Sequence, residues 1–365
     1  MIKSLYLHVP FCKSICYYCD FKRTLYNENM ANMWLDTIAK EISQKNIQPR
    51  LDTIYIGGGT PTALSYSQLE RLLEILTPYS TYTKEFTIES NIESLDDEKI
   101  ALLKKYNVNR ISLGVQSLQN TLLTSMNRKH TKEDVYAKIK QIYNGGIHNI
   151  SIDLIYGFEE QTLSMWIEDL YEVTSWEEIS HISLYSLTIE ENSVFGKQNR
   201  KTQENEVEAQ MYDMAIEILE KHGYAQYEVA NFAKGGKYSM HNCAYWKYDD
   251  FYGIGVGASG KENGVRYDRT SSLKEYVEGK ETIQYETLSI EDQMFENIMM
   301  SLRMRKGLDV NIFKSRYNID IHTRYKDVIQ NEIKKGNLIE ENGFLKVSKQ
   351  GMFYLHDVLV NFLED

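Results

Sequence analysis

The chain has 365 residues, of which 42% are hydrophobic and 25% are charged, and its formal net charge is −11. These values are ordinary for a soluble globular protein with one large domain and a smaller one. The acidity argues against a nucleic-acid-binding protein, which needs a basic face. No apolar run is long enough to span a membrane, and the N-terminus lacks the pattern of a signal peptide. We therefore expect a cytoplasmic protein that binds no nucleic acid.

The first predicted element is a strand over residues 4–9, and a loop with three of the four cysteines, Cys12, Cys16 and Cys19, follows it directly. Gathered thiolates repel one another unless a cation lies between them, so the spacing indicates an iron–sulfur cluster or zinc. A structural zinc site favours a second close pair of ligands, and a disulfide framework would leave one thiol unpaired. Three ordinary buried cysteines are the remaining alternative. A cubane cluster held by three thiolates would leave its fourth iron open to a ligand.

Short strand-like runs alternate with longer helical patterns over the first half of the chain. Strands are predicted over residues 4–9, 53–56, 85–89, 110–113, 149–154 and 181–187. Helices are predicted over residues 30–44, 66–76, 96–105, 132–144 and 162–174. Each helix is long enough for the crossover between two parallel strands. Six such units predict an α/β fold, an incomplete parallel (β/α)6 barrel with its chemistry at the C-terminal ends of the strands.

Glycine and polar residues follow the ends of these strands. The run 57–61, Gly-Gly-Gly-Thr-Pro, lets backbone N–H groups approach a ligand, although a tight turn explains a lone glycine run equally well. Glu89 ends the third strand, where it could cap a turn or accept hydrogen bonds from a ribose or an amino group. Gln116 follows the fourth strand. Asp153 lies in the apolar fifth strand, where burial requires a partner or a ligand. Arg128, taken alone, is a solvated surface charge.

The middle of the chain holds a second informative stretch. A helix is predicted over residues 204–222, and residues 223–232 predict a strand that covers the barrel. Residues 241–246, His-Asn-Cys-Ala-Tyr-Trp, then bring His241 and Cys243 close to two aromatic rings. Such a histidine is usually a half-buried structural residue, but imidazole and thiolate both bind haem iron, and flat rings suit a porphyrin face. The glycines of residues 253–260 lack the spacing of a dinucleotide-binding loop and predict a close-packed strand and turn.

The pattern changes near residue 282. Helices are predicted over residues 292–303, 310–317 and 323–335, then a β-hairpin over residues 338–347 and a last helix opened by residues 348–351. These elements predict a small α+β, winged-helix-like domain. The acidity of the chain argues against DNA binding by this domain, and the family resemblance described below implies that it covers a substrate. We thus divide the chain into a barrel of residues 1–235, a connecting segment of residues 236–281 and a C-terminal domain of residues 282–365.

Together these motifs resemble a known family. The Cys-x3-Cys-x2-Cys loop is similar to that of radical S-adenosylmethionine (SAM) enzymes. Its flanks, residues 6–11 and 20–21, resemble the oxygen-independent coproporphyrinogen III oxidase group. Further runs resemble that group at residues 57–61, 153–162, 181–190 and 227–232. The chain departs from the group at Asn91 and Glu159, where proline is usual. The His-Asn-x-x-Tyr-Trp run at residues 241–246 resembles the HemW branch, whose members are haem chaperones.

The resemblance implies the ligands of three groups. A [4Fe–4S] cluster would be held by Cys12, Cys16 and Cys19, with SAM on its open iron. The implied SAM-binding residues are Tyr6, Gly58, Gly59, Thr60, Glu89, Gln116, Arg128 and Asp153. The fork of the Arg128 guanidinium would bind the SAM carboxylate, and His241 would be an axial ligand of haem.

Two functions fit this resemblance. One is a haem chaperone that binds haem and delivers it to acceptor haemoproteins such as respiratory cytochromes, a role compatible with a homodimer and with peripheral membrane association. The other is a coproporphyrinogen III oxidase, an enzyme that carries out two oxidative decarboxylations. The oxidases have a further cysteine two positions after the third, where this chain has Phe21. That position and the 241–246 run favour the chaperone. A structural metal-binding protein without SAM chemistry would leave the polar strand ends unexplained.

Overall fold

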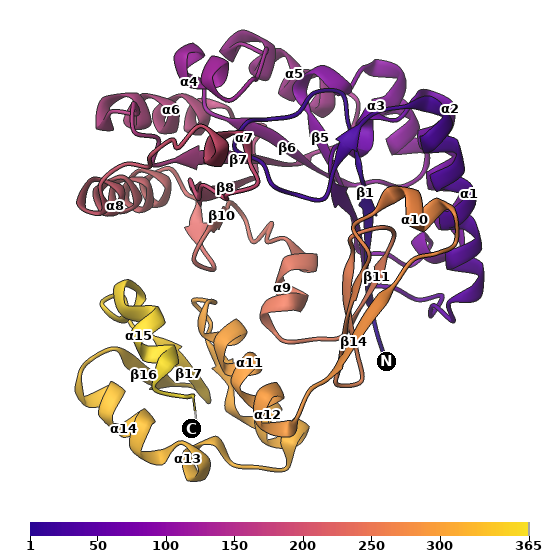
Figure 1. Cartoon of the computed structure of the whole chain (residues 1–365). Coiled ribbons are helices and arrows are strands. Elements are labelled where there is room, and N and C mark those ends of the chain that lie inside the picture. The colour runs from indigo at the N-terminus through magenta and orange to yellow at the C-terminus, as the bar shows by residue number, and fades with distance from the viewer. Residues whose placement is uncertain (364–365) are drawn as a thin grey trace.

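Six parallel strands form the centre of the structure, a computed structural model that describes residues 1–363. They lie side by side in the order β1 (Ser4–Val9), β4 (Thr53–Gly58), β5 (Glu85–Asn91), β6 (Arg110–Gln116), β7 (Asn149–Tyr156) and β8 (His181–Ser186). Each strand begins at its predicted residue. Helices run back along the outside of the sheet between consecutive strands (Figure 1). The predicted (β/α)6 arrangement is therefore confirmed.

The helices of this part of the chain bury apolar side chains, the long ones against this sheet and the two shortest in a separate cluster. They are α1 (Glu28–Gln44), α2 (Tyr66–Ser80), α3 (Asp97–Lys105), α4 (Asn120–Ser125), α5 (Lys132–Asn144), α6 (Leu163–Ser175), α7 (Val194–Lys197) and α8 (Asn205–Lys221). In α1 the buried residues Ala31, Leu35, Ile38 and Ile42 are spaced three or four apart, which places them on one helix face together with Trp34. Asn27 begins this helix because its side chain accepts a hydrogen bond from a backbone N–H of the first turn.

The sheet extends further at the β1 edge than the sequence predicted. β11 (Phe251–Ile254) pairs in parallel with β1, and β12 (Ser259–Glu262), β13 (Val265–Arg269) and β14 (Ile283–Thr287) continue it in antiparallel fashion. The predicted close-packed strand and turn at residues 253–260 are thus β11, a turn and the start of β12. Three strands of the predicted connecting segment, β11, β12 and β13, therefore belong to the main sheet, with α10 (Leu273–Val277) packed on α1. The sheet keeps two free edges, so the barrel is laterally open.

The covering strand predicted over residues 223–232 is wrong. Two short strands, β9 (Ala225–Gln226) and β10 (Asn231–Ala233), pair with each other, and β10 extends the sheet edge antiparallel to β8. The turn between them is closed by Glu228, whose carboxylate accepts a hydrogen bond from the Ala230 N–H at 3.0 Å. A local apolar pattern could not reveal this turn, because a buried glutamate supplies its hydrogen bonds.

The C-terminal part of the chain has its own core and a three-stranded sheet. Its elements are α11 (Ile290–Leu302), β15 (Leu308–Asp309), α12 (Val310–Tyr317), α13 (Ile321–Arg324), α14 (Lys326–Lys334), β16 (Leu338–Glu341), β17 (Phe344–Val347) and α15 (Leu355–Val360). The predicted hairpin is β16–β17, turned by Asn342 and Gly343, both with positive φ. The helix predicted over residues 323–335 is two helices, α13 and α14, which meet at Tyr325.

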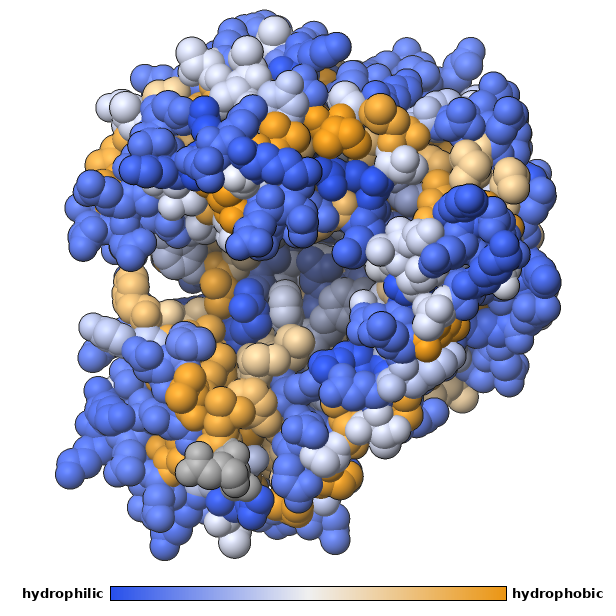
Figure 2. Space-filling model, viewed as in Figure 1, coloured by the Kyte–Doolittle hydropathy of each residue, from blue (hydrophilic) through white to orange (hydrophobic). Residues whose placement is uncertain are grey.

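The C-terminal part meets the barrel around α9 (Met240–Trp246). Ser301 donates a hydrogen bond to the Trp246 carbonyl at 3.2 Å, and Arg316 donates to the Tyr248 carbonyl at 3.1 Å. Beside these contacts the space-filling view shows a hollow between the two parts (Figure 2). None of the helices within residues 1–363 is both long enough and apolar enough to cross a bilayer.

Candidate radical SAM site

A cavity of about 430 Å³ lies at the C-terminal ends of the parallel strands. It brings together most of the residues predicted from the sequence, namely Cys12, Cys16, Cys19, Gly58, Gly59, Thr60, Glu89, Gln116, Arg128 and Asp153. Tyr6 and His241 do not line it. The volume is within the usual range for a small-molecule site.

The cysteine loop forms one wall of this cavity. Cys12 and Cys16 are buried and Cys19 is half-buried, all three as free thiols. Asn127 fixes the loop by donating to the Ile15 carbonyl at 2.8 Å. Burial raises the pKa of the Cys12 thiol to about 11, so a cation is needed to make it a thiolate at neutral pH. Within residues 1–363, no group of three histidine, cysteine, aspartate or glutamate side chains is arranged so that it could bind a single metal ion.

The glycine turn after β4 lets the backbone pass close to the cysteines. Gly58 has a φ of +112°, and a Cβ there would lie 2.5 Å from the His8 ring. A Cβ on Gly59 would lie 3.1 Å from the Cys12 sulfur and 2.7 Å from the Phe11 carbonyl. These contacts show that the turn requires glycine for space as well as for its backbone angles.

Tyr6 supports this turn from behind rather than facing the cavity. The His8 Nε2 atom lies 2.7 Å from the Lys22 carbonyl, which can only accept, so this nitrogen carries the proton. The Nδ1 atom therefore accepts from the Tyr6 hydroxyl at 2.9 Å. Tyr6 thus fixes the ring that Gly58 contacts, and its predicted contact with SAM stays a prediction.

Two half-buried carboxylates, Glu89 and Asp153, face the cavity. Glu89 accepts hydrogen bonds from the Tyr55 hydroxyl at 2.8 Å and from the Gly58 N–H at 3.1 Å. Asp153 accepts from the Ser112 hydroxyl at 3.4 Å. Burial raises the pKa of Glu89 to about 7 and that of Asp153 to about 6. A cationic or hydroxyl-bearing ligand would lower both values, because it would stabilise the charged carboxylates.

The strand end at Gln116 and the nearby Arg128 form the opposite side. Gln116 has a φ of +72°, which is uncommon outside glycine, where the β6–β7 register shifts. Arg128 donates from one Nη atom to the Tyr18 hydroxyl at 3.1 Å. Its Nε and other Nη atoms are buried and have no hydrogen-bond partner. Unpaired buried donors are costly, so this guanidinium fits a carboxylate ligand such as that of SAM.

Comparisons with known proteins place this chain in a family. The family model of the radical SAM superfamily matches residues 6–171, and that of the HemN C-terminal domain matches residues 288–354. The chain is 36% identical to the heme chaperone HemW of Lactococcus lactis over 99% of this chain and 97% of the relative. It is 33% identical to the heme chaperone HemW of Bacillus subtilis, over 99% of each. The chain belongs to the HemW family.

The solved structures add the fold of the HemW-family chain. It superposes on the coproporphyrinogen III oxidase HemN of Escherichia coli, described as a radical SAM enzyme, with a TM-score of 0.86, covering 99% of this chain and 90% of the other. The identity is 21%, so this likeness supports the fold alone. The radical SAM match implies a [4Fe–4S] cluster and SAM, and the thiols and the unpaired Arg128 donors fit these groups.

His241, the predicted haem ligand, lies in α9, and the residue is 1% exposed. Its Nδ1 is 2.8 Å from the Thr53 hydroxyl and its Nε2 is 2.7 Å from the Tyr245 hydroxyl, while its ring stacks on Tyr55. Burial lowers the pKa of His241 to about 3. As placed here, neither nitrogen is available to haem iron. Axial ligation by His241 therefore stays a prediction that requires one of these two hydrogen bonds to break.

Sequence reasoning missed several residues around this HemW-family cavity. Tyr55 holds Glu89, Tyr18 holds Arg128, and Asn91 donates to the Thr60 hydroxyl at 3.0 Å. Tyr55 could have been found, because alternation along β4 puts it on the same face as Gly57. Asn91 is a departure from the motif of the family that the chain resembles, and only the structure shows that it supports the glycine turn.

Proposed function

We propose that this chain is a haem chaperone that binds haem and passes it to acceptor haemoproteins, with a SAM-bearing [4Fe–4S] cluster in its strand-end cavity. The relatives that support this proposal match the chain over nearly its full length and are named heme chaperones. Their names give the activity of those proteins, and the cavity supplies the independent support on this chain.

The observation that carries the proposal is Phe21. Its side chain is 65% exposed and lines the mouth of the cavity beside Cys19. The oxidases that the chain resembles have a cysteine at this position, and a phenyl ring offers no thiol. An exposed aromatic ring instead offers a surface for a flat apolar ligand.

In this proposal the residues of the cavity hold SAM. Arg128 binds the SAM carboxylate. The Glu89 carboxylate and backbone carbonyls of the glycine turn accept hydrogen bonds from the SAM amino group, and Asp153 binds a ribose hydroxyl. When bound to the reduced cluster, SAM supplies one-electron chemistry. The protein's own contribution is to bind and orient SAM and to keep Glu89 and Asp153 charged through the contacts with it.

The setting of the chaperone is part of the same proposal. Acceptors such as respiratory cytochromes would bring a cytoplasmic protein to the membrane surface as a peripheral partner, and a homodimer would bring two haem sites together. In this proposal the chain consists of a barrel of residues 1–235, a connecting segment of residues 236–281 and a C-terminal domain of residues 282–365 that covers bound haem. Gel filtration of the cluster-loaded protein, with and without haemin, measures the oligomeric state directly.

Two assays on anaerobically purified, cluster-loaded protein test the function. Haemin titration should give a saturable Soret band, and the loaded protein should then convert apomyoglobin, a probe acceptor, to its haem form. Incubation with coproporphyrinogen III, SAM and dithionite should leave the porphyrinogen unchanged. Formation of protoporphyrinogen would overturn the chaperone function and establish the oxidase.

A further inference from the structure

A second cavity of about 670 Å³ adjoins the SAM cavity. The two cavities share Ser186, Leu187 and Thr188, the residues that end β8 and continue beyond it. The second cavity is otherwise lined by Ile189, by Glu208 of α8 and by the loop of residues 200–202. We call this second cavity the rim groove.

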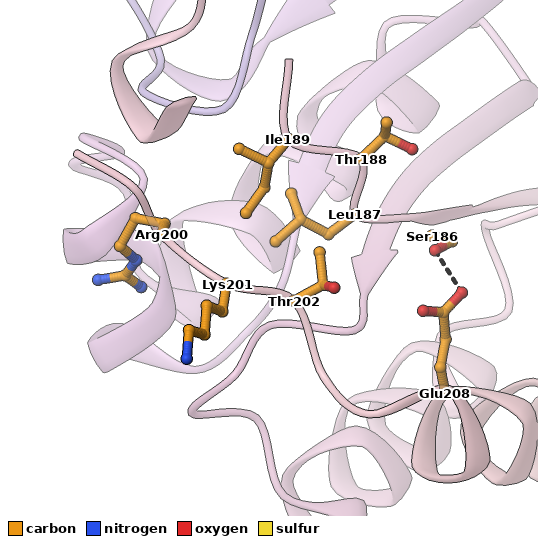
Figure 3. A pocket seen from close by; sticks show the side chains of 8 residues that line it. All are labelled: Ser186, Leu187, Thr188, Ile189, Arg200, Lys201, Thr202 and Glu208. Atoms are coloured by element: carbon orange, nitrogen blue, oxygen red, sulfur yellow. Dashed lines mark hydrogen bonds between the residues drawn. The ribbon is translucent and has the colours of Figure 1, made fainter. Parts of the chain in front are cut away.

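The rim groove has an apolar middle between two polar ends. Leu187 and Ile189 lie between the Arg200–Lys201 side and the opposite side, where Ser186 donates to Glu208 at 2.6 Å (Figure 3). Leu187 and Ile189 pack on a buried apolar cluster of the barrel, so this floor is firm. A ligand that fits the rim groove would be apolar in the middle and anionic at one edge.

The two cations of the rim groove differ in their availability. The Arg200 guanidinium is paired with Glu160 at 2.6 Å and lies over the Phe195 ring. Lys201 is exposed, and within residues 1–363 its ammonium group contacts no acidic side chain. Lys201 is therefore the free cation of this groove, and Arg200 can contribute only at the expense of its pair with Glu160.

The backbone that carries Lys201 is fixed in place. Arg200 donates from its N–H to the Phe195 carbonyl at 3.1 Å, and the Gln203 N–H donates to the Gly157 carbonyl at 2.8 Å. Thr202 pairs with Phe158 in a β-bridge. Lys201 is thus presented from a stable loop next to the end of β7, which reduces the entropy lost on binding a ligand.

We propose that the rim groove binds the carboxylate edge of haem, with Lys201 receiving a propionate. This inference rests on the proposed haem binding and adds the place and the recognition chemistry. Haem is a flat apolar ring with two carboxylates on one edge, which matches an apolar floor with a cation at one end. The macrocycle would extend over Leu187 toward the SAM cavity, through the residues that the two cavities share.

Comparison of haemin with its dimethyl ester, in which both carboxylates are masked, tests this assignment. Cluster-loaded full-length protein is titrated with each compound and the Soret change is followed. We expect Lys201→Gln to weaken haemin binding by about threefold to tenfold, to leave ester binding unchanged, and thus to reduce the preference for haemin. Lys201→Arg should keep the preference.

Lys221→Gln is the matched control. It removes one exposed lysine from the far end of α8, about 20 Å along the helix from Glu208 at 1.5 Å per residue, and it should change neither titration. If the ratio of the haemin Kd to the ester Kd is the same in the wild type and in Lys201→Gln, the assignment of the groove is overturned. Absence of any saturable haemin binding by the wild type would instead overturn the proposed function on which it rests.

Discussion

Arg128 offers the sharpest test of the SAM site, because SAM should reverse the energetic effect of its side chain. Without a ligand, this residue makes one hydrogen bond to Tyr18 and leaves its Nε and one Nη buried and unpaired. The lost bond is worth about 1 kcal/mol, whereas each unpaired buried donor costs about 1–3 kcal/mol. Arg128→Gln should therefore leave the unfolding free energy of SAM-free protein within about 1 kcal/mol of the wild type, or raise it.

With SAM bound, the same substitution should be costly. Loss of one partner from a buried charge pair costs about 3–5 kcal/mol, which corresponds to a Kd increased by more than about 100-fold. The assay is equilibrium dialysis of labelled SAM against anaerobic, cluster-loaded protein, with urea unfolding of the SAM-free form alongside. Arg128→Lys keeps the positive charge but lacks the forked guanidinium, so its SAM Kd should lie between that of the wild type and that of Arg128→Gln. A SAM Kd within threefold of the wild type would refute the reasoning.

Three further outcomes follow from the geometry. Because the folded-state pKa of Glu89 is raised to about 7, its carboxyl group favours the fold below pH 4.5 and this stabilisation is lost as pH rises toward 7. Without SAM, the unfolding free energy of Glu89→Gln relative to that of the wild type should therefore increase by up to about 3 kcal/mol between pH 5 and pH 8. An equal difference between variant and wild type in urea unfolding at both pH values would contradict this. Gly58→Ala should lower Tm by several degrees more than Gly223→Ala, which has a similar φ of +83° but open space around it; equal losses would show that contact is not the cause. Cys12→Ala should abolish the expected content of about four iron and four sulfide per chain, whereas Cys243→Ala should retain it, and a retained cluster in Cys12→Ala would remove the cluster assignment.

The strand ends were predictable because their signal is local. The short strand-like runs gave the first residue of each central strand. The rule that chemistry lies at the C-terminal ends of parallel strands then predicted that Glu89, Gln116 and Asp153 share one site, and all three line the same cavity. The spacing of the three cysteines required no tertiary information. Arg128 was placed by resemblance alone, since its distance from the strand end carries no periodic signal.

The other features depend on partners that are distant in sequence. β11 pairs with β1 across nearly 250 residues, and its short glycine-containing run has no pattern of its own that identifies the edge it joins. His241 was read as an available ligand because its neighbours in sequence are polar or aromatic. Its hydrogen bond to Thr53 depends on how α9 docks under the barrel, which the local sequence does not encode.

The pairing of β1 with β11 has a consequence for synthesis. The cysteine loop follows β1, which pairs with β4 on one side and with β11 on the other. β11, at Phe251–Ile254, is synthesised long after β4. At about 5–20 residues per second, the ribosome needs roughly 12–50 s to reach that strand. Throughout this interval one edge of β1 has no partner and can pair with other chains. The stage of translation before residues 251–254 are made is therefore the one at which this protein most needs protection from aggregation.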